Sequence, residues 1–174
     1  QDHIDGGTGS DHLMGGLDND FVNGNVGDDL LQGDDGNDEL IGSTGNDFID
    51  GGNDDDTVWG GTGSDQIRGG DGVDILRGQQ DSDDIDGGAG DDDIRGGQGD
   101  DYVFGGDGND SIRGGVGHDE LEGGNGNDII RAAFGDDWLA GMRDATVRVT
   151  MPGKIQRIAC YQGWDRSTEP CGQA

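Results

Sequence analysis

Aliphatic residues recur along the chain at intervals of nine. With the count started at Gly6, position 8 of each nine-residue unit is Leu, Ile or Val, from Leu13 to Leu139. Fifteen units follow one another without insertion or deletion and end at Ala140. An aliphatic residue between two outward-facing neighbours is the alternation of a short β-strand. We therefore expect positions 7 to 9 of each unit to form a strand whose middle residue points inward.

Glycine and aspartate occupy the other regular positions. Position 1 is Gly in fourteen of the fifteen units, with Ala132 as the exception, and Gly predominates at positions 2 and 4. Glycines at this density predict a tight turn with φ > 0 between successive strands. Position 6 is Asp in every unit: Asp11, Asp20, Asp29, Asp38, Asp47, Asp56, Asp65, Asp74, Asp83, Asp92, Asp101, Asp110, Asp119, Asp128 and Asp137.

Strands and turns that alternate at this short period predict a solenoid. Two units would complete one coil, with one strand on each of two parallel sheets, and coils would stack about 4.8 Å apart. The expected fold is all-β: a parallel β-roll, or β-solenoid, of fifteen repeats over residues 1–140 with a small C-terminal β cap.

The composition does not explain how such a chain would fold. It holds 40 Gly and 28% hydrophobic residues, and 39 Asp and Glu against 10 Lys and Arg give a net charge of -29. A low hydrophobic content and a high net charge are typical of disordered chains. Folding of this chain therefore needs another source of free energy. The negative charge argues against nucleic acid and anionic membranes as partners, because both are bound through Lys and Arg. Cations are the expected partners.

Stacking would set each position-6 aspartate beside the one two units later. Such columns repel themselves unless a cation lies between the carboxylates. Ca²⁺ takes six to eight oxygen ligands, whereas Mg²⁺ demands a smaller octahedral site. Fifteen turns in two columns leave thirteen gaps, and about thirteen Ca²⁺ ions would carry about +26, which nearly cancels the chain's net charge of -29.

These repeats resemble the RTX (repeats-in-toxin, hemolysin-type) calcium-binding nonapeptide, which forms a β-roll. The resemblance covers about residues 2–140. It implies that the first six residues of each unit form a calcium-binding turn, through backbone carbonyls and the Asp carboxylate, and that the last three form the strand. It therefore implies metal-ligand roles for the fifteen aspartates. It also implies a secreted protein, because such rolls accompany exported toxins, lipases, proteases and adhesins.

Some units depart from the consensus. Among the first fourteen units, position 4 is Asp18, Asp54 or Asp81 in three and position 2 is Asn25, Asp34, Ser43 or Gln79 in four; the last unit, AAFGDDWLA, is atypical, as terminal repeats usually are. Asn and Asp tolerate left-handed backbone better than other non-Gly residues, so we expect these turns to form, with weaker or rearranged sites. The unit at residues 78–86 is the most doubtful, because it loses Gly at both positions.

The two ends of the roll raise separate expectations. Residues 141–174 carry a net charge of +2, and the segments TVRVTM and KIQRIACY on either side of Pro152-Gly153 predict a β-hairpin that caps the last coil. A disulfide between Cys160 and Cys171 would fit an extracellular setting, although two free thiols remain an alternative. The N-terminal end has no expected cap, so we expect it to be covered either by a preceding domain or by self-association with another subunit.

Basic residues of the roll occur only at position 9, as Arg68, Arg77, Arg95, Arg113 and Arg131. The last four are eighteen apart and should stack on one face. They suggest either a solvated face that offsets nearby carboxylates or a ladder that binds an anionic surface glycan. His3, His12 and His118 fall at outward or turn positions, and we expect surface residues there.

The favoured function is an extracellular calcium-binding β-roll module, with no enzymatic activity, that folds when it binds Ca²⁺. No catalytic motif is evident, and no apolar run approaches the ~18 residues of a transmembrane helix, so membrane insertion is not expected. Two alternatives remain: a calcium-dependent adhesive protein that assembles head to tail into fibres, and a C-terminal fragment of a secreted hydrolase or toxin.

Overall fold

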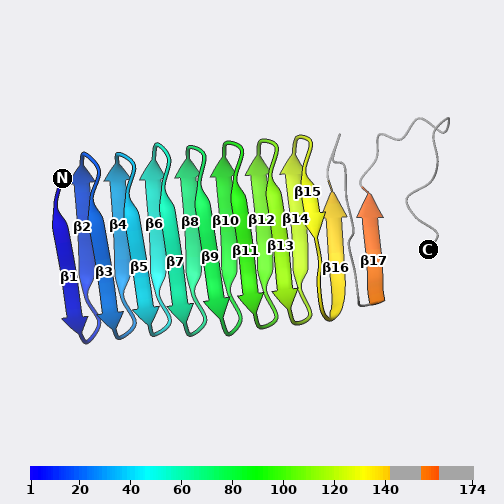
Figure 1. The fold of residues 1–174 in the computed structure, drawn as a ribbon, viewed down its shortest axis with the longest axis horizontal. Coiled ribbons are helices and arrows are strands. Elements are labelled where there is room, and N and C mark those ends of the chain that lie inside the picture. The colour runs from blue at the N-terminus through cyan, green and yellow to red at the C-terminus, as the bar shows by residue number, and fades with distance from the viewer. Residues whose placement is uncertain (142–153, 161–174) are drawn as a thin grey trace.

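The fold is a rod of stacked β-strands without helices over the residues that the structure describes. The structure is a computed structural model that describes residues 1–141 and 154–160. Successive strands alternate between two sheets, so the chain winds as a flattened coil (Figure 1). The expected all-β parallel solenoid with two repeats per coil is confirmed.

The first sheet has eight strands and contains β1 (His3–Thr8), β3 (Phe21–Val26), β5 (Glu39–Thr44), β7 (Thr57–Thr62), β9 (Ile75–Gln80), β11 (Asp93–Gln98), β13 (Ser111–Val116) and β15 (Ile129–Arg131). The second sheet has nine strands and contains β2 (His12–Leu17), β4 (Leu30–Asp35), β6 (Phe48–Asn53), β8 (Gln66–Asp71), β10 (Asp84–Ala89), β12 (Tyr102–Asp107), β14 (Glu120–Asn125), β16 (Asp136–Gly141) and β17 (Lys154–Cys160). All neighbouring strands are parallel, and those of the roll pair with residues eighteen positions apart, as in Ile94↔Ile112.

The strands are longer than the repeat pattern predicted. Most run for six residues, through positions 7 to 9 and on through positions 1 to 3 of the next unit. Pairing continues there, for example Gly88↔Gly106 and Ala89↔Asp107. The reason is that the Gly-Gly segment keeps the same eighteen-residue register as the strand before it, so its backbone stays in the ladder. The turn is therefore confined to positions 4 to 6.

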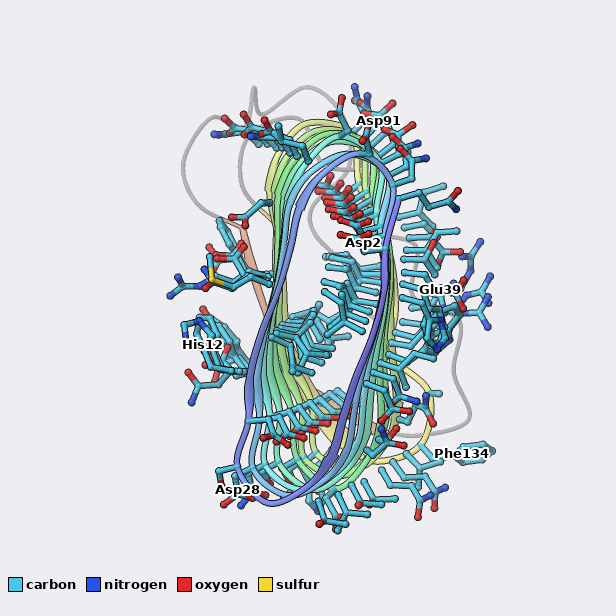
Figure 2. All side chains as sticks on the ribbon, turned by 90° about the vertical axis from the view of Figure 1, so that its left-hand side faces the viewer. Asp2, His12, Asp28, Glu39, Asp91 and Phe134 are labelled. Carbon is cyan, nitrogen blue, oxygen red and sulfur yellow. The ribbon has the colours of Figure 1, made fainter. Side chains whose placement is uncertain are left out.

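Two stacks of aliphatic side chains, one from each sheet, fill the roll. The position-8 residues from Val22 to Leu139 are at most 1% exposed, and Ile4 and Leu13 pack against the N-terminal end of these stacks. Figure 2, which looks along the rod, shows these side chains stacked between the two sheets. The core is one side chain deep for each strand, which agrees with the low hydrophobic content of the sequence.

The backbone keeps its turn geometry where the sequence departs from Gly. Positive φ occurs at positions 2 and 4, and the non-Gly residues that adopt it are the seven departures: Asp18, Asn25, Asp34, Ser43, Asp54, Gln79 and Asp81. Even the doubtful unit keeps the conformation, with φ of 88° at Gln79 and 69° at Asp81. The expectation that these turns form is confirmed, because stacking on neighbouring coils holds them in place.

The C-terminal segment adds one strand to the end of the second sheet. Strand β17 pairs in parallel with β16, with a register shift between Asp137 and Trp138 that sets Ile158 opposite Leu139. The first arm of the expected hairpin, residues 146–151, and Cys171 lie outside the described residues. The cap, the hairpin and the Cys160–Cys171 disulfide therefore stay predictions. No helix in the described part is long and apolar enough to cross a membrane.

Candidate metal centre

The position-6 aspartates end each turn and point into the roll. Figure 2 shows two columns of carboxylates inside the coil, one at each narrow end, with the aliphatic stacks between them. The fourteen from Asp20 to Asp137 are at most 4% exposed, and Asp11 at the N-terminal end is half-buried. The structure thus brings all fifteen candidate residues into the two predicted columns.

One oxygen of each carboxylate from Asp20 to Asp137 is hydrogen-bonded to the backbone. Oδ1 accepts a hydrogen bond from the backbone N–H of the aspartate eighteen residues earlier, as in Asp92 N to Asp110 Oδ1 at 3.0 Å. Thirteen such bonds, of 2.7 to 3.2 Å, link the fifteen aspartates into their two columns. With a further bond from Asp2 N to Asp20 Oδ1, this ladder fixes the rotation of the carboxylates from Asp20 to Asp137.

The second oxygen has no partner in the protein. Oδ2 is buried without a hydrogen bond in all fifteen aspartates, from Asp11 to Asp137. A buried carboxylate oxygen without a partner is costly, and native proteins nearly always supply a hydrogen bond or an ion there. The same atom is left unpaired in every turn, so the unpaired oxygen is a regular feature of the repeat and not of one irregular site.

Backbone oxygen lies close to this unpaired atom. A methyl group placed on Gly105 would come within 2.4 Å of Asp110 Oδ2 and 2.4 Å of the carbonyl oxygen of Gly123. The same holds at Gly51, with Asp56 Oδ2 at 2.4 Å and the Gly69 carbonyl at 2.5 Å. A carboxylate oxygen and a carbonyl oxygen of the next coil therefore face the space that a side chain at position 1 would fill.

This crowding explains why position 1 requires glycine. Positions 2 and 4 need Gly for their positive φ, whereas the position-1 glycines, such as Gly51 and Gly105, do not adopt it. What excludes a side chain there is the inward carboxylate and the neighbouring backbone. The two Gly of each Gly-Gly pair therefore serve different physical requirements.

Burial raises the pKa of the interior aspartates. Desolvation is the largest cause, neighbouring carboxylates add to it, and the Oδ1 hydrogen bond opposes it. The pKa rises to about 6 in Asp47, Asp74, Asp101 and Asp110, to about 7 in Asp56, Asp65, Asp92 and Asp119, and to about 8 in Asp83. At neutral pH these carboxylates lack a positive charge to balance them within the described protein atoms.

A second hydrogen-bond ladder runs along the outside of the turns. Position-5 side chains accept a bond from the backbone N–H of position 5 in the following coil, as in Asp91 Oδ1 from Asn109 N at 2.7 Å and His118 Nδ1 from Asp136 N at 3.0 Å. Nine such bonds span 2.7 to 3.3 Å. The sequence analysis missed this ladder. Its signal is that position 5 is mostly Asn, Asp or Ser, short side chains that bond locally to backbone.

The arrangement suits a hard cation with oxygen ligands. No group of three or more His, Cys, Asp or Glu side chains converges as a metal site within residues 1–141 and 154–160, so a side-chain-only centre such as a zinc site is not formed there. Each turn instead offers one carboxylate oxygen beside backbone carbonyl oxygens. Carboxylates and carbonyls are the ligands that Ca²⁺ takes in proteins, so the residues present fit calcium.

The three histidines lie away from these columns. His3 stacks on Phe21 with ring centroids 4.6 Å apart, and His12 Nε2 lies 2.9 Å from Gln32 Oε1 on the outer face. His118 takes part in the position-5 ladder. All three are exposed, as expected, whereas the unpaired position-6 carboxylate oxygens are buried.

Comparison with known proteins agrees with this geometry. A search of curated proteins finds no match. The family model for the RTX calcium-binding nonapeptide repeat matches in four copies, over residues 1–31, 32–67, 68–103 and 104–139. The matched copies cover nearly the whole roll and most of the chain, and the chain belongs to the RTX calcium-binding nonapeptide repeat family.

Proposed function

We propose that this chain is an extracellular module that folds by binding a ladder of Ca²⁺ ions between its stacked turns. The observation that carries the proposal is the buried Oδ2 atom without a partner, repeated in all fifteen position-6 aspartates. An ion beside each such atom would supply the missing partner and the missing positive charge.

The ligands in this proposal come from each turn and its neighbour in the same column. Asp110 Oδ2 and the carbonyl oxygen of Gly123 represent the set that recurs along the roll. The fifteen aspartates from Asp11 to Asp137 would hold the ions, with up to about thirteen ions in the thirteen intervals of the two columns. When bound, calcium supplies charge neutralisation and cross-links between coils.

Folding and binding would be a single event. The core is one aliphatic side chain deep for each strand, and the interior carboxylates repel one another in the absence of cations. Metal-binding free energy is folding free energy in a protein whose site does not exist when unfolded. The chain would be unfolded where calcium is scarce and folded in the millimolar calcium of extracellular fluid, which suits extracellular calcium modules of modest affinity.

Isothermal titration calorimetry with CaCl₂ and with MgCl₂ tests the proposal. We expect cooperative binding of about ten or more Ca²⁺ ions for each chain and much weaker binding of Mg²⁺, whose small octahedral site does not suit this loop. Binding of only one or two ions, or equal binding of the two metals, would contradict the ladder.

A further inference from the structure

The outer face of the first sheet carries a column of arginines. Arg77, Arg95, Arg113 and Arg131 occupy position 9 of β9, β11, β13 and β15 and pair directly in register. Neighbouring members are one strand apart, about 4.8 Å. We call these four residues the arginine column. Figure 2 shows nitrogen-tipped side chains on the face that also carries Glu39.

The other sheet of the same coils has the opposite charge. The outward positions of β10 hold Asp84 and Asp86, and those of β14 hold Glu120 and Glu122. On the first sheet, the outward positions 7 and 9 of β9 to β15 contain four Arg and one acid, Asp93. A chain of net charge -29 therefore presents one positive strip on this half of the roll.

One carboxylate does not neutralise this column. Arg77 Nη2 lies 3.2 Å from Asp93 Oδ2, and its Nη1 donates to the carbonyl oxygens of Leu76 and Asp93. Arg95 lies 3.9 Å from the same Asp93 oxygen. Within the described part of the chain, Arg113 and Arg131 form no ion pair.

Guanidinium groups of the column also repel one another. Burial lowers the pKa of Arg77, Asp93 opposes this, and the charges of Arg95 and Arg113 lower it further. Repulsion along the column is therefore present without a bound anion. An anion that contacts several members would relieve it.

The surroundings of the column suit a carbohydrate chain. Next to it, Gly97 and Gly115 lack side chains, so backbone is accessible beside Arg95 and Arg113. Gln80 and Gln98, exposed and paired in register, add amide donors and acceptors along the same edge. The column continues into Trp59, which pairs with Arg77. Guanidinium, amide and indole groups side by side can bind the acidic groups, hydroxyls and ring faces of sugars.

We propose that the arginine column binds a linear acidic polysaccharide, with an acidic group on successive sugars, along the axis of the roll. The column is one residue wide and repeats at about the spacing of sugars in an extended chain, so several weak contacts add along one polymer. Polysaccharide binding by the arginine column goes beyond calcium binding and rests on the proposed function only in requiring a folded roll.

Nucleic acid fits this face less well. Its binding depends on neutralising many phosphates and falls steeply with salt, and the narrow strip is bordered by acidic turns such as Asp91 and Asp100. Single strands also need a series of aromatic platforms, whereas the column itself holds Trp59 as its one aromatic neighbour in register. A narrow, uniformly spaced chain of acidic sugars agrees better with these features.

Microscale thermophoresis, which measures the affinity of the chain for a galacturonate octasaccharide at a fixed saturating calcium concentration, tests the proposal. The matched neutral ligand is the fully methyl-esterified octasaccharide. The test variant is Arg95→Gln/Arg113→Gln, with Arg95→Lys/Arg113→Lys to retain charge. The control is Arg68→Gln, because Arg68 is exposed at position 9 of β8 in the second sheet, where it lies 5.2 Å from the Phe48 ring.

We expect the octasaccharide to bind and its methyl ester not to bind. The Gln pair should weaken binding about tenfold or more, the Lys pair less, and Arg68→Gln should leave it unchanged. Circular dichroism in calcium should be the same for all variants, which separates this test from that of calcium-dependent folding. Equal binding by the Gln pair and wild type, equal binding of the methyl ester, or equal or tighter binding of a single-stranded DNA octamer would overturn the proposal.

Discussion

The two oxygens of each interior aspartate have different surroundings. Oδ1 of Asp110 accepts the backbone N–H of Asp92, while Oδ2 is buried without a partner. An aspartate with a purely structural role would have both oxygens satisfied, as buried polar groups usually are. The asymmetry therefore separates the part of the residue that positions it from the part available to a metal.

Substitution of Asp110 by Asn should have opposite effects with and without calcium. In calcium, Asp110→Asn removes a charged ligand, and we expect the free energy of unfolding to fall by about 3 kcal/mol and the calcium stoichiometry to fall. Without calcium, the same change removes a buried charge and should not destabilise any residual roll. Denaturant unfolding at fixed calcium and calorimetric titration measure the two effects.

Asp84→Asn is the matched control for Asp110→Asn. Asp84 is exposed at position 7 of β10, so its loss should leave both stability and stoichiometry nearly unchanged. If Asp110→Asn lowered the free energy of unfolding by the same amount with and without calcium, Asp110 would be a structural residue and not a ligand.

The raised pKa values of the interior aspartates predict a pH dependence. Desolvation raises the pKa of Asp110 to about 6, of Asp92 to about 7 and of Asp83 to about 8. Because these values exceed the ordinary 3.8, metal-free stability is greatest below pH 3.8 and is lost as pH rises through 6 to 8. Calcium needs deprotonated carboxylates, so its affinity falls at the pH where the aspartates of the unfolded chain become protonated.

Calcium affinity should therefore change little between pH 8 and pH 5.5 and fall steeply as the pH approaches about 4, because the aspartates of the unfolded, calcium-free chain have ordinary pKa values. Calorimetric titrations at pH 8, 5.5 and 4 measure this change. Release of protons on calcium binding at pH 7 would contradict it, because it would show that the calcium-free chain already holds buried, protonated carboxylates.

Sequence periodicity predicted the aspartate columns but not their detail. An invariant Asp in an eighteen-residue coil must stack on its neighbours, so the columns follow from arithmetic alone. The division between Oδ1 and Oδ2 could not be predicted, because it depends on how the turn directs the N–H of the neighbouring Asp. The position-5 ladder was missed because Asn, Asp, Ser and His share a bonding geometry without sharing an identity.

At the scale of the element, the turn is shorter and the strand longer than the repeat suggested. Gly-Gly-x was assigned to the turn because glycine readily adopts the positive φ of a tight turn. In the structure these residues pair in register from coil to coil, as Gly97↔Gly115 does. Contacts with neighbouring coils outweigh the local preference, which a single repeat cannot reveal.

The turn at residues 78–86 has a strained residue whose replacement should stabilise the roll. Gln79 has φ of 88°, a conformation that costs a non-Gly residue about 1–2 kcal/mol. We expect Gln79→Gly to raise the free energy of unfolding by about 1 kcal/mol in calcium, measured by thermal or denaturant unfolding.

Gln80→Gly is the matched control, one residue along the same strand and also exposed. Gln80 does not have positive φ, so glycine there should destabilise slightly through its backbone entropy. If Gln79→Gly destabilised the roll as much as Gln80→Gly, the left-handed conformation of Gln79 would carry no strain.

For the whole molecule, charge and fold depend on each other. The roll encloses two columns of carboxylates in a chain of net charge -29. A thin core cannot offset this repulsion together with the conformational entropy of 40 Gly. Stacked repeats are stabilised mainly by their neighbours, so ions between coils would act where the stability of a solenoid is determined.

The overall architecture was the most predictable feature of this protein. An unbroken nine-residue period fixes two strands for each coil, and position 8 identifies the core from Val22 to Leu139. Beyond the last repeat the period stops, so the parallel pairing of Lys154–Cys160 with β16 could not be predicted. A tail without periodicity takes its position from the surface that it meets.

Circular dichroism of the same sample in millimolar calcium and after excess chelator tests the central claim most directly. The account predicts a β-sheet spectrum and a cooperative thermal transition with calcium, a disordered spectrum without it, and full recovery when calcium is restored. A chelated sample that kept its β-sheet spectrum and melted at the same temperature would contradict it.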